Sequence, residues 1–188
     1  MKKGVCIILS ILLPIAVLTF AVVKADASDA KWQDFRKRMD QSLVRMTYSF
    51  VFDFDGHHYS IHGELFSQDD AYKVIDEAFS VYDDKETQWV VNSVSKEVVI
   101  QCSSVSPYGF LENPSSLLEL FGQNPAGAEV RVSYSKDGLP VKISADIDGG
   151  MNVTVLIPET VFLPKDNTAE FSFDTRKLDG SWVVTDMR

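Results

Sequence analysis

Apolar and polar residues alternate with a period of two along much of this chain, and short apolar runs between polar breaks follow one another most closely from residue 72 to residue 102. Four runs rich in β-branched and aromatic residues are separated by short charged or small polar segments; they are 72–76, 78–82, 87–92 and 97–102. Such runs indicate strands joined by tight turns, and none has the length or period of a helix. The sequence therefore predicts an antiparallel meander at the centre of the protein.

The stretch before this meander predicts a hairpin with an aromatic face. Four aromatic residues alternate with smaller or polar ones on the first strand: Tyr48, Phe50, Phe52 and Phe54. Asp55-Gly56 suits the turn because glycine takes a positive φ without strain, and alternation resumes over residues 59–65. A run of aromatic residues on one face suits the wall of an apolar cavity and, equally, an ordinary core.

Two segments have the pattern of helices. In residues 28–46 one apolar stripe recurs every three or four residues, which is typical of a helix that packs on a sheet; it consists of Trp32, Phe35, Met39 and Leu43. Residues 115–121 are apolar on most sides, with Pro114 suited to the first turn and Gly122 to the end. We expect this second, inserted helix, with Phe110-Leu111 before it, to act as a lid.

Strand patterns resume after the inserted helix. Alternation predicts strands within 129–134, 141–147 and 153–157, a loop between Pro158 and Pro164, and two last strands at 169–174 and 181–187. The chain then has about ten or eleven strands, the number and spacing of an all-β sheet or barrel. The predicted fold class is mainly β.

The first 27 residues have the features of a signal peptide. Lys2-Lys3 is followed by 20 uncharged residues from Gly4 to Val23, and Ala25-Asp26-Ala27 has the form of a cleavage site. We expect export, with cleavage after Ala27 and one domain over residues 28–188. The alternative is an uncleaved inner-membrane anchor, because the uncharged segment is long enough to span a bilayer.

Charge and cysteine content narrow the choice of partners. Residues 1–27 carry a net charge of +2, so their removal changes the formal charge from −9 to −11 over the remaining 161 residues. This acidity argues against binding to nucleic acid or to anionic membrane surfaces. Cys102 is then the single cysteine, which excludes an internal disulfide. Because it alternates with Val98 and Ile100, we expect a buried, non-essential thiol.

The sequence offers no catalytic or metal-binding constellation. His58 and His62 share a strand face but lie about 13 Å apart, too far to share one metal ion, and His57 points away. No Gly-x-Ser-x-Gly elbow, phosphate loop or calcium loop is present. We therefore expect no enzymatic activity and no cofactor or metal, and the surface that acts should be apolar.

Several motifs, in order, resemble the LolA family of periplasmic lipoprotein carriers. They are Gly63-x-Leu65, Tyr72-Lys73-Val74, Trp89-Val90-Val91-Asn92, Glu97-Val98-x-Ile100, Ser106-Pro107-Tyr108-Gly109-Phe110-Leu111, Phe171-Ser172-Phe173-Asp174 and Val183-Val184-Thr185-Asp186-Met187-Arg188. The resemblance covers most of the chain after the signal segment. The family's arginine after the Gly-x-Leu strand, which ties its lid shut, is replaced here by Gln68-Asp69-Asp70.

The resemblance implies an unclosed antiparallel β-barrel whose mouth is covered by the N-terminal helix and the inserted helix. It also implies a periplasmic carrier that holds acyl chains of lipoproteins or lipids in an apolar cavity and delivers them toward the outer membrane. An inner-membrane releasing complex and an outer-membrane acceptor would be its partners, and we expect a monomer. The candidate ligand-binding residues are Trp32, Phe35, Tyr48, Phe50, Phe52, Tyr72, Val74, Phe79, Trp89, Phe110, Leu117, Leu118 and Phe121.

Two other functions compete with the carrier. The same fold can serve as a periplasmic sensor, whose occupancy by a lipid or lipoprotein changes its binding to a partner. A hydrolase of acyl lipids is the third reading, but it lacks a nucleophile with a base beside it.

Overall fold

The structure is a computed structural model that describes residues 30–54, 57–77, 79–103, 109–111, 113–119, 130–147 and 151–188. The proposed signal segment, the Asp55-Gly56 turn and Phe121 lie outside these residues.

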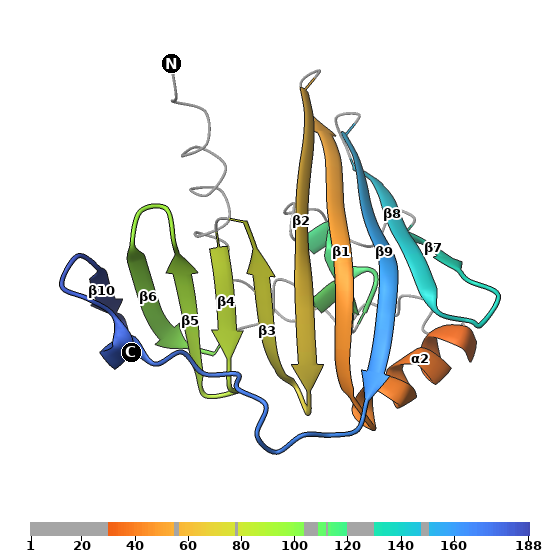
Figure 1. Cartoon of the computed structure of the whole chain (residues 1–188). Coiled ribbons are helices and arrows are strands. Elements are labelled where there is room, and N and C mark those ends of the chain that lie inside the picture. Colours follow the sequence, from red (N-terminus) through yellow and green to blue (C-terminus); the bar gives the residue numbers. More distant parts are fainter. Residues whose placement is uncertain are drawn as a thin grey trace.

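Ten strands form one sheet in the order β10-β6-β5-β4-β3-β2-β1-β9-β8-β7. Their bounds are β1 Leu43–Phe54, β2 His57–Gln68, β3 Ala71–Asp76, β4 Phe79–Asp83, β5 Thr87–Asn92, β6 Glu97–Cys102, β7 Val130–Tyr134, β8 Pro140–Ile147, β9 Met151–Leu163 and β10 Val183–Asp186. Neighbouring strands run antiparallel except β10, which pairs parallel with β6. The sheet curves but does not close, because β10 and β7 stay apart at its two edges (Figure 1). The predicted mainly β, unclosed fold is confirmed.

The central meander is also confirmed, with β2 to β6 paired in sequence order. At two turns of the meander, side chains of turn residues accept hydrogen bonds from backbone N–H groups. Asp84 Oδ1 accepts the N–H groups of Glu86 and Thr87 between β4 and β5, and Asn92 Oδ1 accepts those of Val94 and Ser95 between β5 and β6. Asp and Asn favour turns for this reason.

The N-terminal helix is shorter than predicted. Helix α2 spans Ala30–Asp40 and buries Trp32, Phe35 and Met39, but the chain enters β1 at Leu43. The prediction of a helix to residue 46 is wrong because the spacing of Met39 and Leu43 continues the helical stripe into a segment that also alternates. Val44 and Met46 lie on the same strand face as Tyr48, and all three are buried.

The C-terminal third differs from the prediction in two places. The expected loop between Pro158 and Pro164 is instead the end of β9, which pairs with β1 to Leu163. Pro158 is tolerated because the register shifts between Thr47 and Ser49, and a bulge relieves a strand of one ladder hydrogen bond. The expected strand at 169–174 is irregular and leads into the 3₁₀ helix η2, Thr175–Lys177.

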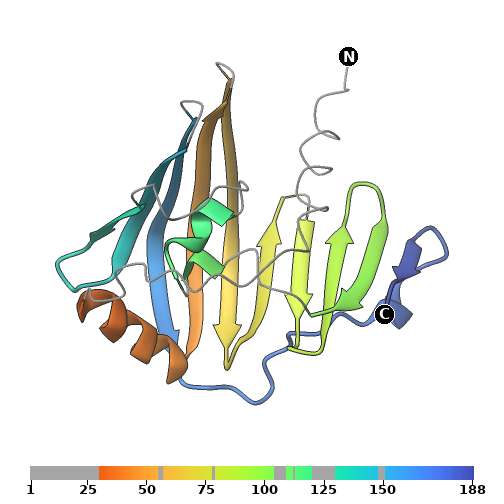
Figure 2. The same ribbon diagram turned by 180° about the vertical axis from the view of Figure 1, so that it is seen from behind.

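The two faces of the sheet are covered by different parts of the chain. We call the face that carries the helices the inner face: α2, the 3₁₀ helix η1 (Gly109–Leu111) and α3 (Ser116–Glu119) lie in front of it in Figure 2. The opposite, outer face is crossed at β4–β6 by the chain that runs from β9 to β10 (Figure 1). Each cover seals its own hydrophobic cluster.

The outer cluster holds the C-terminal segment against the meander. Val91, Val98 and Ile100 are buried there against Phe173, Leu178 and Trp182. Cys102 continues the face of these strand residues but is exposed. The prediction of a buried thiol is therefore wrong, because alternation assigns Cys102 to the correct face while the covering residues end before it.

Candidate functional site

The site is built on the inner face of β1, where alternation places every second side chain. Val44, Met46 and Tyr48 are buried at one end of the strand, and Phe50 and Phe52 are half-buried toward the other. The Phe52 ring stacks on that of Tyr59 in β2, with centroids 4.9 Å apart, and meets Phe50 edge-on at 5.9 Å. Three members of the predicted aromatic face, Tyr48, Phe50 and Phe52, thus form a continuous apolar strip; the side chain of the fourth, Phe54, lies outside the described residues.

Gly63 makes room for this strip. It pairs with Tyr48 across β1 and β2, and a Cβ atom at Gly63 would lie 2.6 Å from both the Tyr48 hydroxyl oxygen and the Ile75 carbonyl oxygen. Only glycine leaves room here for the hydroxyl end of the tyrosine ring. The glycine of the Gly-x-Leu motif therefore has a packing role.

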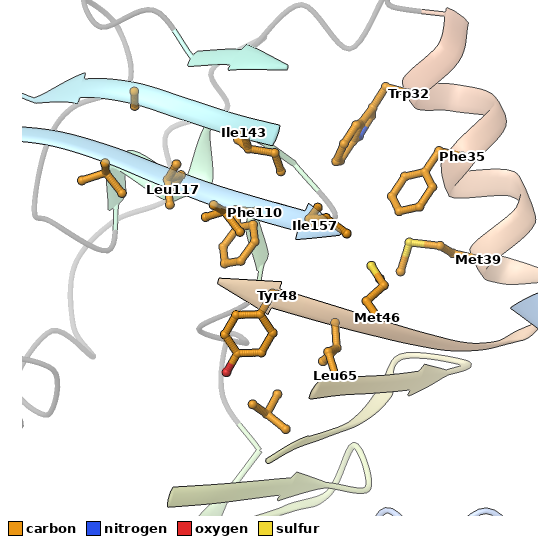
Figure 3. Close-up of a cluster of buried hydrophobic side chains, with 14 of the residues drawn as sticks. Trp32, Phe35, Met39, Met46, Tyr48, Leu65, Phe110, Leu117, Ile143 and Ile157 are labelled. Atoms are coloured by element: carbon orange, nitrogen blue, oxygen red, sulfur yellow. The ribbon is translucent and has the colours of Figure 1, made fainter. Parts of the chain in front are cut away.

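Helix α2 packs over one part of the inner face. The rings of Trp32 and Phe35 have centroids 5.2 Å apart, and Phe35 meets Phe162 of β9 edge-on at 6.3 Å. Two cations of the helix sit over aromatic rings: Arg38 Cζ is 4.0 Å from the centre of Phe162 and Lys31 Nζ is 5.3 Å from that of Tyr134. The apolar side of the helix faces the sheet, with Trp32, Phe35 and Met39 directed at the strands (Figure 3).

Helices η1 and α3 cover another part. Phe110 is 2% exposed, and Leu117 and Leu118 are fully buried beside Ile143, Val153 and Val155. Adjacent helical residues point about 100° apart, so the burial of both leucines means that the four-residue helix is enclosed on more than one side. The predicted inserted helix exists over Ser116–Glu119, and Figure 3 shows Phe110 and Leu117 directed at the strands.

Beyond the helices the apolar surface continues across the meander. Leu65, Val74, Val81, Val90 and Val99 are successive cross-strand partners from β2 to β6. Leu65 and Val74 are buried in the helix-covered cluster, whereas Val81, Val90 and Val99 are half-buried. We call these five residues the valine row. It leads from the core under the helices to β6, the strand next to the β10 edge of the sheet.

A polar row runs beside the valine row on β3 to β6, two residues away from it on each of these strands. Its members are the cross-strand partners Tyr72, Asp83, Gln88 and Gln101. Gln88 Nε2 donates to the Tyr72 hydroxyl at 2.7 Å and to Asp83 Oδ2 at 3.3 Å, and Gln101 Nε2 donates to Gln88 Oε1. Asp83 is 1% exposed and Gln88 4%. We call these four residues the polar row.

The carboxylate of Asp83 is held by neutral donors. Ser103 Oγ lies 2.8 Å and 2.9 Å from its two oxygens, and the Lys85 backbone N–H donates to Oδ1 at 2.8 Å. Buried polar groups need such partners. Sequence reasoning placed Asp83 in the charged segment between two strands and missed the row. Gln88 and Gln101 share the phase of Val90 and Val99, but β5 and β6 are apolar on both faces, so the sequence does not show that this phase is the inward one.

The structure does not bring all the candidate residues together. Trp32, Phe35, Tyr48, Phe50, Phe52, Tyr72, Val74, Phe110, Leu117 and Leu118 join one cluster. Phe79 is half-buried at the end of β4 and belongs to neither cluster. Trp89 lies on the outer face with Tyr82 and Trp182, so its assignment to the same surface is wrong. Phe121 lies outside the described residues.

Other charged groups form pairs at the β2–β3 turn and in the C-terminal segment. Where the family resemblance leads one to look for an arginine, Asp69 instead pairs with Lys165, whose hydrogen bond holds the pKa of that carboxyl below its usual range. Gln68 bonds to Asp166 of the same segment. The hydrogen bond from Arg188 lowers the pKa of Asp186 to about 2.

Two histidines take part in small polar contacts on the outer face of the hairpin. His58 Nδ1 lies 2.8 Å from Asp53 Oδ1, and His62 Nε2 lies 2.9 Å from Ser60 Oγ. Within the described residues, no group of three or more His, Cys, Asp or Glu side chains is arranged to hold a metal ion. In the same part of the chain, no helix combines the length and hydropathy required to cross a membrane.

Comparisons with known proteins yield likeness in shape alone. No protein-family model and no curated protein matches the sequence. A crystal structure of an uncharacterized conserved protein from Thermus thermophilus aligns with a TM-score of 0.48 and 8% identity, covering 82% of this chain and 98% of that one. A DUF1329 family protein from Desulfovibrio piger aligns with a TM-score of 0.36 and 10% identity, covering 78% and 96%. Alignments this weak assign no family.

Proposed function

We propose that the protein is an exported, periplasmic carrier that holds the acyl chains of lipoproteins or other acylated molecules against the inner face of its sheet. The observation that carries this proposal is the continuity of one apolar surface. It is fully buried under α2, η1 and α3 and becomes half-buried along Val81, Val90 and Val99. The order of motifs shared with the LolA family supports the same reading.

The mechanism is binding without turnover. Each methylene of an acyl chain that leaves water contributes about 0.8 kcal/mol, so an extended apolar surface suffices for affinity. The short α3 is held by the burial of Leu117 and Leu118, and a four-residue helix has little stability of its own. A chain that slides beneath it would replace the same contacts, which suits η1 and α3 to the role of a lid.

Mass spectrometry of the protein purified from the periplasm without detergent tests the proposal. We expect co-purified acylated molecules, and delipidated protein should take up a neutral apolar fluorophore such as N-phenyl-1-naphthylamine. The loaded protein should also pass its ligand to acceptor vesicles, which a sensor has no need to do. Protein that carries no lipid and does not bind the fluorophore would refute the carrier function.

A further inference from the structure

The inner face of the meander carries carboxylates but no cation. Strands β3, β4, β5 and β6 are described throughout, and their alternation assigns three positions of each to this face. The charged residues at those positions are Asp76, Asp83 and Glu97, and none of the positions is Lys, Arg or His. The cation of β3, Lys73, points to the outer face, where its Nζ lies 5.1 Å from the centre of the Tyr82 ring.

The segment of the chain that contributes the proposed lid also lacks cationic residues. From Glu97 through Val130 it contains no Lys, Arg or His, and this stretch includes β6, η1 and α3. Helix α2 lies toward the β7–β9 side of the inner face (Figure 2), and two of its cations, Lys31 and Arg38, sit on rings of β7 and β9. On the described strands β3 to β6, the inner face therefore offers a ligand on the valine row acidic and neutral side chains but no cation.

Because of Asp83, the lack of cations on this face affects the free energy of binding a charged ligand. Its side chain is almost completely buried, two residues along the strand from Val81 and thus about 6.6 Å from it along the same face. Its hydrogen-bond donors are neutral. Charges interact more strongly at a site shielded from water than in solution, so a second negative charge here is disfavoured. An uncharged carbonyl or hydroxyl group can instead bond to the half-buried amide of Gln101, whereas both amide hydrogens of Gln88 already bond to Tyr72 and Asp83.

We infer that the meander selects acyl chains whose polar end is uncharged, linked as esters or amides, and discriminates against free fatty acids. The inference rests on the proposed function, since it concerns the ligand of the same surface. The acyl chain lies along the valine row, and the polar row contacts the polar end of the ligand and selects it. Ligands with acyl chains of equal length bury the same apolar surface, so the difference between their affinities comes from the polar end alone.

The test compares monolauroylglycerol with laurate at pH 8, below their critical micelle concentrations. Each ligand displaces N-phenyl-1-naphthylamine from the delipidated protein. We expect monolauroylglycerol to bind at least about tenfold more tightly, which corresponds to about 1.4 kcal/mol. Equal affinities, or tighter binding of laurate, would overturn the inference and leave the carrier function standing. Failure of both ligands to bind would refute the carrier function as well.

A charge placed in the polar row gives a second test that does not depend on head-group size. Gln101 is half-buried and its amide donates to Gln88, a contact that a lysine ammonium can also make. Gln101→Lys should tighten laurate about tenfold and leave monolauroylglycerol within about twofold.

Two variants serve as matched controls. Gln101→Met removes the same amide without adding charge and should not tighten laurate. Lys85→Met removes the exposed cation of the β4–β5 turn and should leave the preference for monolauroylglycerol unchanged. A folded Gln101→Lys protein with unaltered laurate affinity would show that the polar row does not meet the ligand's polar end.

Discussion

Replacing Gly63 with alanine should destabilise the protein, because the added methyl group has no room. Its Cβ would lie 2.6 Å from the Ile75 carbonyl oxygen, 2.6 Å from the Tyr48 hydroxyl oxygen and 2.8 Å from Tyr48 Cζ. The Ile75 oxygen belongs to the backbone of β3 and cannot move without disturbing the ladder with β2. Tyr48 is 7% exposed and is enclosed by the inner cluster.

The magnitude follows from two opposing effects. Overpacking of a well-packed core costs about 1–3 kcal/mol. Loss of glycine's freedom in the unfolded chain offsets about 0.4–1 kcal/mol of this. We expect a net loss of about 1–2 kcal/mol, and about 2–4 °C in the melting temperature per kcal/mol for a chain of this size.

Urea denaturation followed by circular dichroism measures the effect, with Gly180→Ala as the control, because a Cβ atom at Gly180 meets nothing within 4 Å. In a Tyr48→Leu background, the penalty of Gly63→Ala should shrink but persist, since the Ile75 oxygen remains. If Gly63→Ala proves as stable as Gly180→Ala, the close approach of Tyr48 to the β2 backbone does not exist and the reasoning fails.

Three further predictions test the lid, the thiol and the C-terminal strand. Leu117→Ala should cost about 2–5 kcal/mol and weaken binding of the neutral fluorophore, whereas Trp182→Ala on the outer face should lower stability alone; equal loss of binding in both variants would exclude a lid. Cys102 should react with a thiol reagent in the folded protein without denaturant, and a requirement for denaturant would contradict its exposure. The folded-state pKa of Asp186 is lowered to about 2, below its ordinary value of about 3.9. The stability that its ionised carboxylate contributes is therefore fully present above about pH 4 and is lost as pH falls through 2. Hydrogen exchange at β10, corrected for intrinsic rates, should accelerate in that window, and Asp186→Asn should abolish the dependence; the same acceleration in the variant would refute it.

The parts of the fold that were predicted correctly depend on local pattern. The meander follows from short runs of β-branched and aromatic residues between polar turns, and the inward face of β1 follows from the regular spacing of Tyr48, Phe50 and Phe52. Each of these predictions depends only on residues that are close together in the sequence. Local pattern gave a wrong helix end between Met39 and Met46, because the helical spacing of apolar residues there overlaps with the alternation of the following strand.

Other parts depend on contacts between distant segments. The parallel pairing of β10 with β6 joins residues more than 80 positions apart, such as Val183 and Glu97, and no local pattern specifies it. Strand β5 is apolar on both faces at Trp89, Val90 and Val91, so alternation gives no phase and Trp89 was assigned to the wrong side. The polar row was missed because inward amides look like solvent-facing residues until their partners are known.

The outer cluster explains how the valine row can remain half-buried in a stable sheet. Strands β7 to β9 and β1 to β3 are held by the helices that pack on their inner face. Strands β5 and β6 are held from the opposite side, where Phe173, Leu178 and Trp182 cover Val91, Val98 and Ile100. Because the outer cover anchors these strands, their inner side chains need no permanent cover of their own. The meander can therefore keep its fold while a ligand enters and leaves the inner face, which is what a carrier requires.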